Sequence, residues 1–135
     1  MNKTDQVTEL LQQAKTVAVV GLSDTPARPS YGVAVYLQTH GYRIVPVNPS
    51  LREVLGEKAY PSLLEVPAEV KIDIVDVFRR SEYLPEIVAQ AIQRKVAAIW
   101  MQEGVIHEQA AETARQAGIL VIMDRCILKE HQKRF

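Results

Sequence analysis

The chain has little that would support disulfides, membrane insertion or binding by charge alone. Its 135 residues contain one cysteine, Cys126, which excludes an intramolecular disulfide and any metal site built from several cysteines. Sixteen basic and sixteen acidic side chains cancel, so no net field attracts nucleic acid or an anionic membrane. With 47% hydrophobic and only 6% aromatic residues, the chain is long enough for one sizeable core, and we expect a single domain over residues 1–135.

Long apolar runs are also absent. The longest, residues 16–22 and 118–123, are far too short to cross a bilayer. The opening MNKTDQVTEL lacks the apolar core of a signal peptide. We therefore expect a cytoplasmic protein that binds neither membrane nor nucleic acid.

Hydrophobic patterning predicts strands and helices in alternation. Runs rich in Val and Ile without strict alternation are typical of strands buried on both faces, and five occur, at residues 17–20, 44–47, 72–77, 97–101 and 119–123. Helical spacing covers residues 4–15, 30–41, 81–95 and 107–118, with Thr4 and Ser81 as N-caps, and Ser62 and Glu65 have capping-box spacing. Right-handed crossovers then predict an α/β fold: a three-layer, doubly wound parallel sheet of about five strands.

The loop after the first strand, GLSDTPARPS at residues 21–30, carries the clearest binding signal. In doubly wound sheets, ligands bind at the carboxyl ends of the strands, where the strand order reverses. Gly21 permits close backbone approach, and the helix after the loop offers unpaired N–H groups and its positive dipole end to an anion. Ser23, Ser30 and Arg28 add hydroxyl groups and a cation that suit a phosphate. The pattern favours a diphosphate; the alternative is a proline-stiffened surface loop with Arg28 in solvent.

The residues after the second strand constrain which nucleotide such a loop would hold. The dinucleotide fingerprint G-x-G-x-x-G is replaced by G-L-S-D-T-P, and Asn48 and Pro49 stand where an NAD enzyme carries Asp or Glu. Arg52 suits an additional ribose phosphate, which CoA carries at the 3′ and NADP at the 2′ position. Spacing does not separate these ligands, and a solvated arginine beside Glu53 is an equal alternative.

Four stretches resemble the stand-alone CoA-binding proteins, whose domain is similar to the N-terminal domain of the succinyl-CoA synthetase alpha subunit. They are VGLSDTPARPSYGV, GYRIVPVNP followed by LG, WMQEGV and MDRC, within residues 15–128. The resemblance implies a Rossmann-like fold with CoA across the strand ends. It implies a diphosphate on the first loop and adenosine beside the second strand, with binding residues Gly21, Leu22, Ser23, Asp24, Pro26, Arg28, Ser30, Tyr31, Val47, Asn48, Pro49 and Arg52.

The resemblance also assigns residues after the third and fourth strands. We expect Val77, Phe78 and Arg79 to face the first loop and to lie against the adenine or the pantetheine arm. For Phe78, core packing is an equal alternative. We expect Gln102, Glu103 and Gly104 to lie beside the pantetheine. The alternative is that these residues form a simple turn from strand to helix. Cys126 matches the cysteine of a G-P-N-C stretch in the synthetases, although Met-Asp-Arg precedes it here. We hypothesise that it reaches the CoA thiol; the alternative is a buried structural cysteine.

Catalytic groups are not evident. The synthetases use a phosphorylated histidine in a second domain and a partner subunit. Residues 1–135 contain neither, so we expect no such catalysis. We interpret His40, His107 and His131 as surface or capping residues, while Asp73 and Asp76 fall on opposite strand faces. We favour a non-catalytic module that binds CoA or an acyl-CoA. The alternatives are a small NADP-binding oxidoreductase and a ligand-free interaction subunit, and a protein partner or homo-oligomer is compatible with each.

Overall fold

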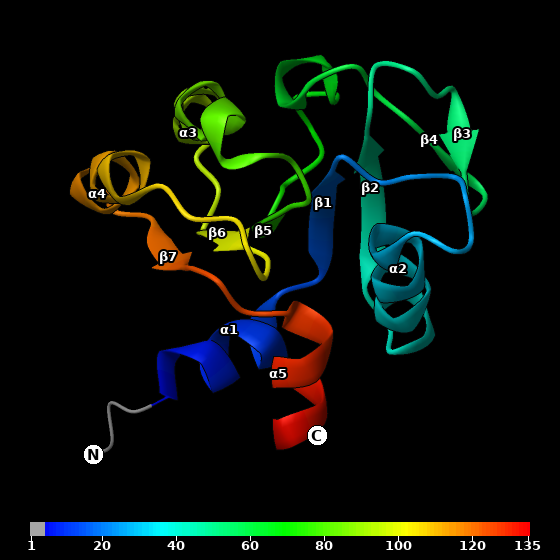
Figure 1. The fold of residues 1–135 in the computed structure, drawn as a ribbon, viewed down its shortest axis with the longest axis horizontal. Helices are drawn as coiled ribbons and strands as arrows, with labels where there is room; N and C mark the ends of the chain where they lie inside the picture. The colour runs from blue at the N-terminus through cyan, green and yellow to red at the C-terminus, as the bar shows by residue number, and fades with distance from the viewer. Residues whose placement is uncertain (1–4) are drawn as a thin grey trace.

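The structure, a computed structural model, describes residues 5–135 and confirms the expected parallel sheet (Figure 1). Its five strands lie in the order β2-β1-β5-β6-β7, and every neighbouring pair is parallel. Their bounds are β1 Thr16–Val20, β2 Arg43–Val47, β5 Ile74–Val77, β6 Ala98–Met101 and β7 Leu120–Ile122. Each strand lies where a Val- and Ile-rich run predicts one, because such runs bury both strand faces.

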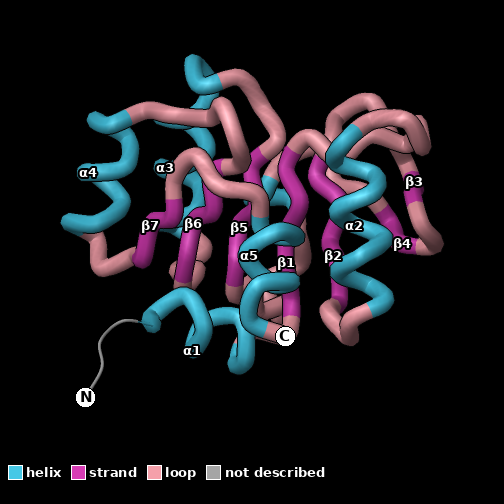
Figure 2. The backbone as a smooth tube through the Cα atoms, turned by 60° about the horizontal axis from the view of Figure 1, so that its bottom comes forward, coloured by secondary structure: helices cyan, strands magenta, loops and turns pink. Residues whose placement is uncertain are grey.

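Helices cover both faces of the sheet, which makes the fold the expected three-layer, Rossmann-like α/β domain (Figures 1 and 2). On one face lie α1 (Gln6–Gln13), α2 (Pro29–Thr39) and α5 (Ile127–Arg134); on the other lie α3 (Leu84–Gln93) and α4 (Glu108–Gln116). Alternate side chains of each strand enter the two cores: Val17 and Val19 face α2, whereas Ala18 and Val20 face α3. No helix within residues 5–135 has the length and apolarity needed to cross a membrane.

Two elements have no counterpart in the sequence prediction. A hairpin of two-residue strands, β3 (Glu53–Val54) and β4 (Glu57–Lys58), comes after β2; strands this short have no periodicity to detect. The segment after Cys126 forms helix α5, in which Ile127 and His131 are buried. The interpretation of His131 as a surface residue is therefore wrong, because the side of α5 that carries His131 packs against α2.

The caps of the helices differ in part from the prediction. Asp5 is the N-cap of α1, accepting a hydrogen bond from the Thr8 N–H at 3.2 Å, whereas Thr4 lies outside the described residues. Ser81 does not cap α3: it begins a 3₁₀ turn, η3 (Ser81–Tyr83), and its hydroxyl accepts the Ile106 N–H. Ser62 likewise makes no side-chain cap bond. His107 is confirmed as a cap, since its Nδ1 accepts from the Ala110 N–H at the start of α4.

Candidate functional site

The strand order reverses between β1 and β5, so the loops after these strands border the crevice where ligands bind in such sheets. Gly21, the first residue after β1, has a φ of +89° and donates its N–H to the Val47 carbonyl at 2.8 Å. A Cβ atom at this position would lie 2.5 Å from the Phe78 carbonyl oxygen. The absence of a side chain at Gly21 thus allows the two loops to touch through their backbones.

The loop from residue 21 to residue 28 is held in shape by the hydroxyl groups of Ser23 and of Ser30, in the first turn of α2. The buried Ser30 Oγ accepts the Ser23 N–H at 3.0 Å, and Ser23 Oγ accepts the Thr25 N–H at 3.0 Å. A hydroxyl oxygen that accepts one bond can still donate its hydrogen to an anion. The side chain of Leu22 is fully buried, so only its backbone borders the crevice. The exposed residues of the loop include Asp24, Pro26 and Arg28.

Asn48 ties the loop after β2 to the loop after β1. Its Nδ2 donates to the Leu22 carbonyl at 2.9 Å, and its Oδ1 accepts the Ser50 N–H at 2.8 Å. Its own N–H donates to the Tyr60 carbonyl at 2.9 Å. Asn48, predicted as a ligand contact, therefore holds the neighbouring loops in position with the polar atoms of its side chain.

Two cavities lie at the strand ends, one toward each helix layer. The smaller, of about 180 Å³, is lined by Val20, Val47, Pro49, Pro61, Ser62, Leu63, Arg79, Tyr83, Glu86, Ile87 and Gln90. The larger, of about 470 Å³, is lined by Pro29, Val33, Phe78, Arg79, Arg80, Gln102, Glu103, Gly104, Val105 and Cys126. Arg79 lines both cavities, so it stands at the boundary between them.

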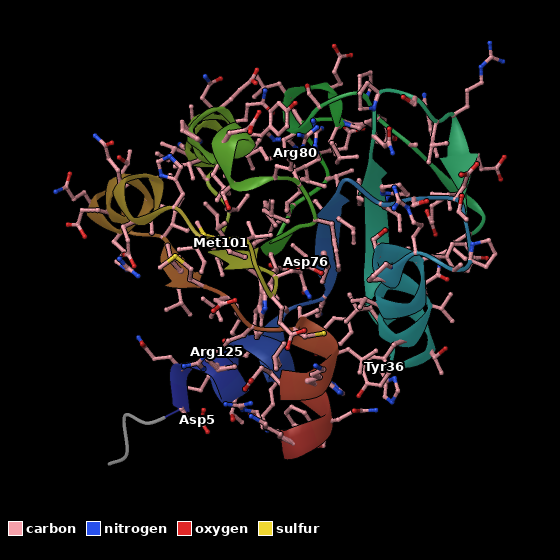
Figure 3. The ribbon with its side chains drawn as sticks, in the orientation of Figure 1. Asp5, Tyr36, Asp76, Arg80, Met101 and Arg125 are labelled. Carbon is pink, nitrogen blue, oxygen red and sulfur yellow. The ribbon has the colours of Figure 1, made fainter. Side chains whose placement is uncertain are left out.

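The guanidinium of Arg79 stacks over the ring of Tyr83, with 4.2 Å between its Cζ atom and the ring centroid. A cation over an aromatic face is attracted by the ring quadrupole, which holds Arg79 at the boundary between the cavities. Tyr83 and Arg80 are not among the predicted site residues. Arg80 follows the predicted residue Arg79 directly at the end of β5, and this position is the signal that could have found it (Figure 3).

The smaller cavity has a rigid back wall because of Arg94, at the end of α3. Its guanidinium donates to the carbonyl oxygens of Leu63 and Val66, both at 2.6 Å, and to those of Pro67 and Val70 at 3.0 and 3.1 Å. Four carbonyl groups of residues 63–70, a segment that begins with the 3₁₀ turn η2 (Leu63–Glu65), are thereby satisfied by one side chain. This clamp fixes Leu63 where it lines the smaller cavity.

The wall of the larger cavity joins the turn after β6 to the start of α5. The buried Gln102 accepts the Ile127 N–H through its Oε1 at 3.1 Å, and the Gly104 N–H donates to Asp124 Oδ1 at 2.8 Å. Glu103 pairs with Lys129 at 3.0 Å on the surface. Cys126, the half-buried N-cap residue of α5, faces the same cavity.

Of the predicted site residues, those that line one of the two cavities, or both, are Val47, Pro49, Phe78, Arg79, Gln102, Glu103, Gly104 and Cys126. The others lie outside the cavities. Val77 is fully buried in the core. The half-buried Tyr31 packs against the hydrophobic cluster under α2. Arg52 is exposed at the start of the hairpin and does not line either cavity.

One buried charge-bearing group lies beneath the site. Asp76, in the middle of β5, is fully buried on the face that also carries Phe78, and neither of its carboxyl oxygens has a hydrogen-bond partner among the described residues (Figure 3). Burial raises the pKa of this carboxyl well above its ordinary value, because a charge without a partner is strongly disfavoured in the core. No group of three or more His, Cys, Asp or Glu residues in 5–135 could hold a metal ion.

Known proteins have similar sequences and folds. The chain is 44% identical over 126 residues to the protein YneT of Bacillus subtilis, covering 93% of this chain and 92% of YneT. It is 34% identical over 97 residues to the ADP-forming acetate–CoA ligase II of Archaeoglobus fulgidus; the match spans 70% of this chain but only 14% of the ligase. A structure from Thermus thermophilus superposes with a TM-score of 0.92 at 37% identity and full coverage of both chains.

The family described as CoA binding domain matches residues 15–132, which contain both cavities and the loops between them. A hypothetical protein from Pyrococcus horikoshii OT3 has the same fold, with a TM-score of 0.90 at 39% identity over 93% of this chain and 87% of that chain. The chain therefore belongs to the family of CoA-binding domains.

Proposed function

We propose that the protein binds CoA or an acyl-CoA as a non-catalytic module, with the ligand lying across the carboxyl ends of β1 and β5. The observation that carries the proposal is the pair of cavities on either side of the switch point, joined at Arg79, in a chain of the CoA-binding family. The adenosine occupies the smaller cavity and the pantetheine arm the larger. The diphosphate lies between them, on the loop after β1.

The chemistry of the loop supports the position of the diphosphate. Helix α2 begins at Pro29, so its unpaired N–H groups and positive dipole end are directed at the end of this loop. Arg28 precedes the helix, and Arg79 lies across the crevice. Both guanidinium groups are permanently charged and can bind phosphate oxygens through two donors at once.

The composition of the larger cavity supports the position of the pantetheine arm. Pro29, Val33, Phe78 and Val105 give it an apolar lining, to which Arg79, Arg80, Gln102 and Glu103 add polar and charged groups. Binding sites for small molecules are commonly apolar with a few convergent polar groups. The arm carries amides between short aliphatic segments, which suits such a lining, and its thiol end would approach Cys126.

The relation to the acetate–CoA ligases supports a binding role for this part of the chain. The matched region is a small fraction of the Archaeoglobus fulgidus ligase, so the ligase activity is not expected of these residues by themselves. A module that holds CoA without transforming it would act as a carrier, a sensor or a regulatory subunit.

Calorimetric titration with CoA tests the proposal, with 3′-dephospho-CoA and NADP as comparators in the same buffer. We expect saturable binding of CoA and weaker binding of 3′-dephospho-CoA. Binding of NADP without binding of CoA would overturn the proposal in favour of a redox role. Absence of binding, together with an unchanged melting temperature in CoA, would favour a ligand-free interaction subunit, because a ligand of the native state must stabilise it.

A further inference from the structure

The ends of α2 and α5 that point away from the cavities are joined by a cluster of aromatic and titratable side chains, the His131 cluster: Tyr36, His40, Tyr42, His131 and Phe135. Figure 3 labels Tyr36, on α2. Nδ1 of His131 shares a hydrogen bond of 2.7 Å with the Tyr36 hydroxyl. The ring centroid of His131 lies 5.1 Å from that of His40, 4.7 Å from that of Phe135 and 5.8 Å from that of Tyr42. Only 7% of the surface of His131 is exposed.

The carboxylates of Glu130 on α5 and of Asp5 beside α5 are already paired with other cations. Glu130 is bound by Arg134 at 2.8 Å and by Lys133 at 3.3 Å. Asp5, at the start of α1, faces Arg134 at 3.6 Å. Among residues 5–135, no ion pair joins His131 to a carboxylate that would balance a positive charge on its ring.

The other groups around His131 also favour its neutral form. Tyr36 and Tyr42 are uncharged near neutral pH, and burial raises the pKa of both hydroxyls. The ring of His40 stacks on Tyr36 and lies against His131, so it supplies no negative charge there. Burial, followed by the neighbouring His40, lowers the pKa of His131.

The opposite ends of the same two helices form part of the larger cavity. Pro29 is the first residue of α2, Cys126 is the N-cap of α5, and both line this cavity. The Ile127 N–H of α5 is held by Gln102, which lines it as well. At 1.5 Å per residue, His131 is about 7.5 Å along the helix axis from Cys126. A rigid helix of this length transmits a change in docking from one end to the other.

We propose that the His131 cluster is a pH-sensitive clasp, which holds α5 against α2 and thereby keeps the wall of the larger cavity in place. Protonation of His131 puts an unbalanced charge into a buried ring that faces His40, so the clasp weakens and the cavity wall loosens. A histidine with a lowered pKa in the folded state stabilises the fold above its ordinary pKa, and this stability is lost as the pH falls. Only the link between the clasp and CoA rests on the proposed function.

Urea unfolding at about pH 7.5 and about pH 5.5, on either side of the histidine range, tests the clasp without any ligand. The variant His131→Gln keeps a polar side chain that cannot charge, and His107→Gln, at the cap of α4, is the matched control. We expect acidification to destabilise the wild-type protein and His107→Gln more than His131→Gln. Equal losses in wild type and His131→Gln would overturn the proposal.

Titration of CoA at the same two pH values tests the link to the cavity. Acidification also protonates the phosphate of the ligand, and this effect is the same for every variant. The informative quantity is therefore the difference between variants in how much CoA affinity changes with pH. We expect the wild-type protein to lose affinity on acidification by about fivefold or more beyond His131→Gln, which is the lower end of typical coupling between sites. An equal change in both would overturn the link. Absence of CoA binding at either pH would overturn the proposed function, and the unfolding experiment would still decide the clasp.

The wild-type protein supplies an independent test if His131→Gln does not fold. Imidazole NMR should show His131 titrating below the ordinary histidine range, together with shifts of the Cys126 and Ile127 amide signals. A titration of His131 that leaves both amides unmoved would overturn the transmission along α5.

Discussion

A Cβ atom on Gly21 would lie 2.5 Å from the carbonyl oxygen of Phe78. The loops after β1 and β5 therefore touch through backbone atoms at the point where the strand order reverses. The φ of +89° at Gly21 adds a second restriction, since residues with a side chain rarely adopt it. The fold itself requires glycine here, before any ligand is considered.

Gly21→Ala should destabilise the protein by more than its backbone conformation alone explains. Gly118→Ala is the matched control, because Gly118 has a φ of +87° but open space around it. We expect the control to lose about 1–2 kcal/mol from the left-handed conformation, and Gly21→Ala to lose roughly 1–3 kcal/mol more from the clash. Urea unfolding measures both, and equal losses would show that the Phe78 contact relaxes without cost.

Arg52→Ala should weaken the binding of CoA and leave that of 3′-dephospho-CoA unchanged. Arg52 is exposed and could reach a 3′-phosphate outside the smaller cavity. An exposed charge-assisted contact of about 1 kcal/mol corresponds to roughly a fivefold loss of affinity. Calorimetry of both ligands with both proteins isolates this contact. Arg115→Ala, on the surface of α4, is the control, and equal losses for the two ligands would assign Arg52 a role other than binding that phosphate.

Asp76→Asn should make the protein more stable at neutral and alkaline pH. Because burial raises the pKa of Asp76 in the folded state, the folded protein binds more protons than the unfolded chain above the ordinary aspartate pKa. Stability therefore falls as the pH rises from there toward the folded pKa. Asparagine does not titrate, so its advantage should grow over this range to roughly a few kcal/mol. Urea unfolding as a function of pH measures it.

Asp73→Asn is the matched control, and we expect it to change the stability of the protein in the opposite direction. The Asp73 carboxylate accepts the N–H groups of Lys15 and Thr16 at 2.8 and 3.0 Å. Loss of its charge should destabilise the protein by about 1 kcal/mol. If the free energy of unfolding of Asp76→Asn changed with pH in parallel with that of the wild type, this result would contradict an unpartnered acid at position 76.

Cys126 should form a mixed disulfide when the protein is treated with oxidised CoA. The Cys126 thiolate attacks one sulfur of the CoA disulfide, one CoA becomes attached to the protein, and the other leaves as a thiolate. Mass spectrometry should find one CoA on the wild-type chain and none on Cys126→Ser, which lacks the only cysteine. The absence of an adduct would contradict the approach of the CoA thiol to Cys126. A reaction no faster than that of glutathione disulfide would show that the larger cavity does not direct it.

Some residues of the candidate site can be predicted from the sequence, and others cannot. The loop at residues 21–30 is recognisable because it lies between a buried strand and a helix, and both are local signals. Tyr83 and Val33 are not recognisable, because they line the cavities only through the way η3 and α2 pack. The family resemblance assigns Asn48 and Gln102 to the ligand, whereas their side chains bond to loops and helices distant in the chain.

By itself, the sequence determined the five strands to within two residues at each end, and the helices that alternate with them. Runs of Val and Ile and helical spacing act between residues close together in the chain, so they can be read without a fold. Only the tertiary structure decided that β1 lies beside β5, which brings Phe78 against Gly21. It also decided that the segment after Cys126 is a helix with a buried His131, because a helix of eight residues is stable only when it is packed.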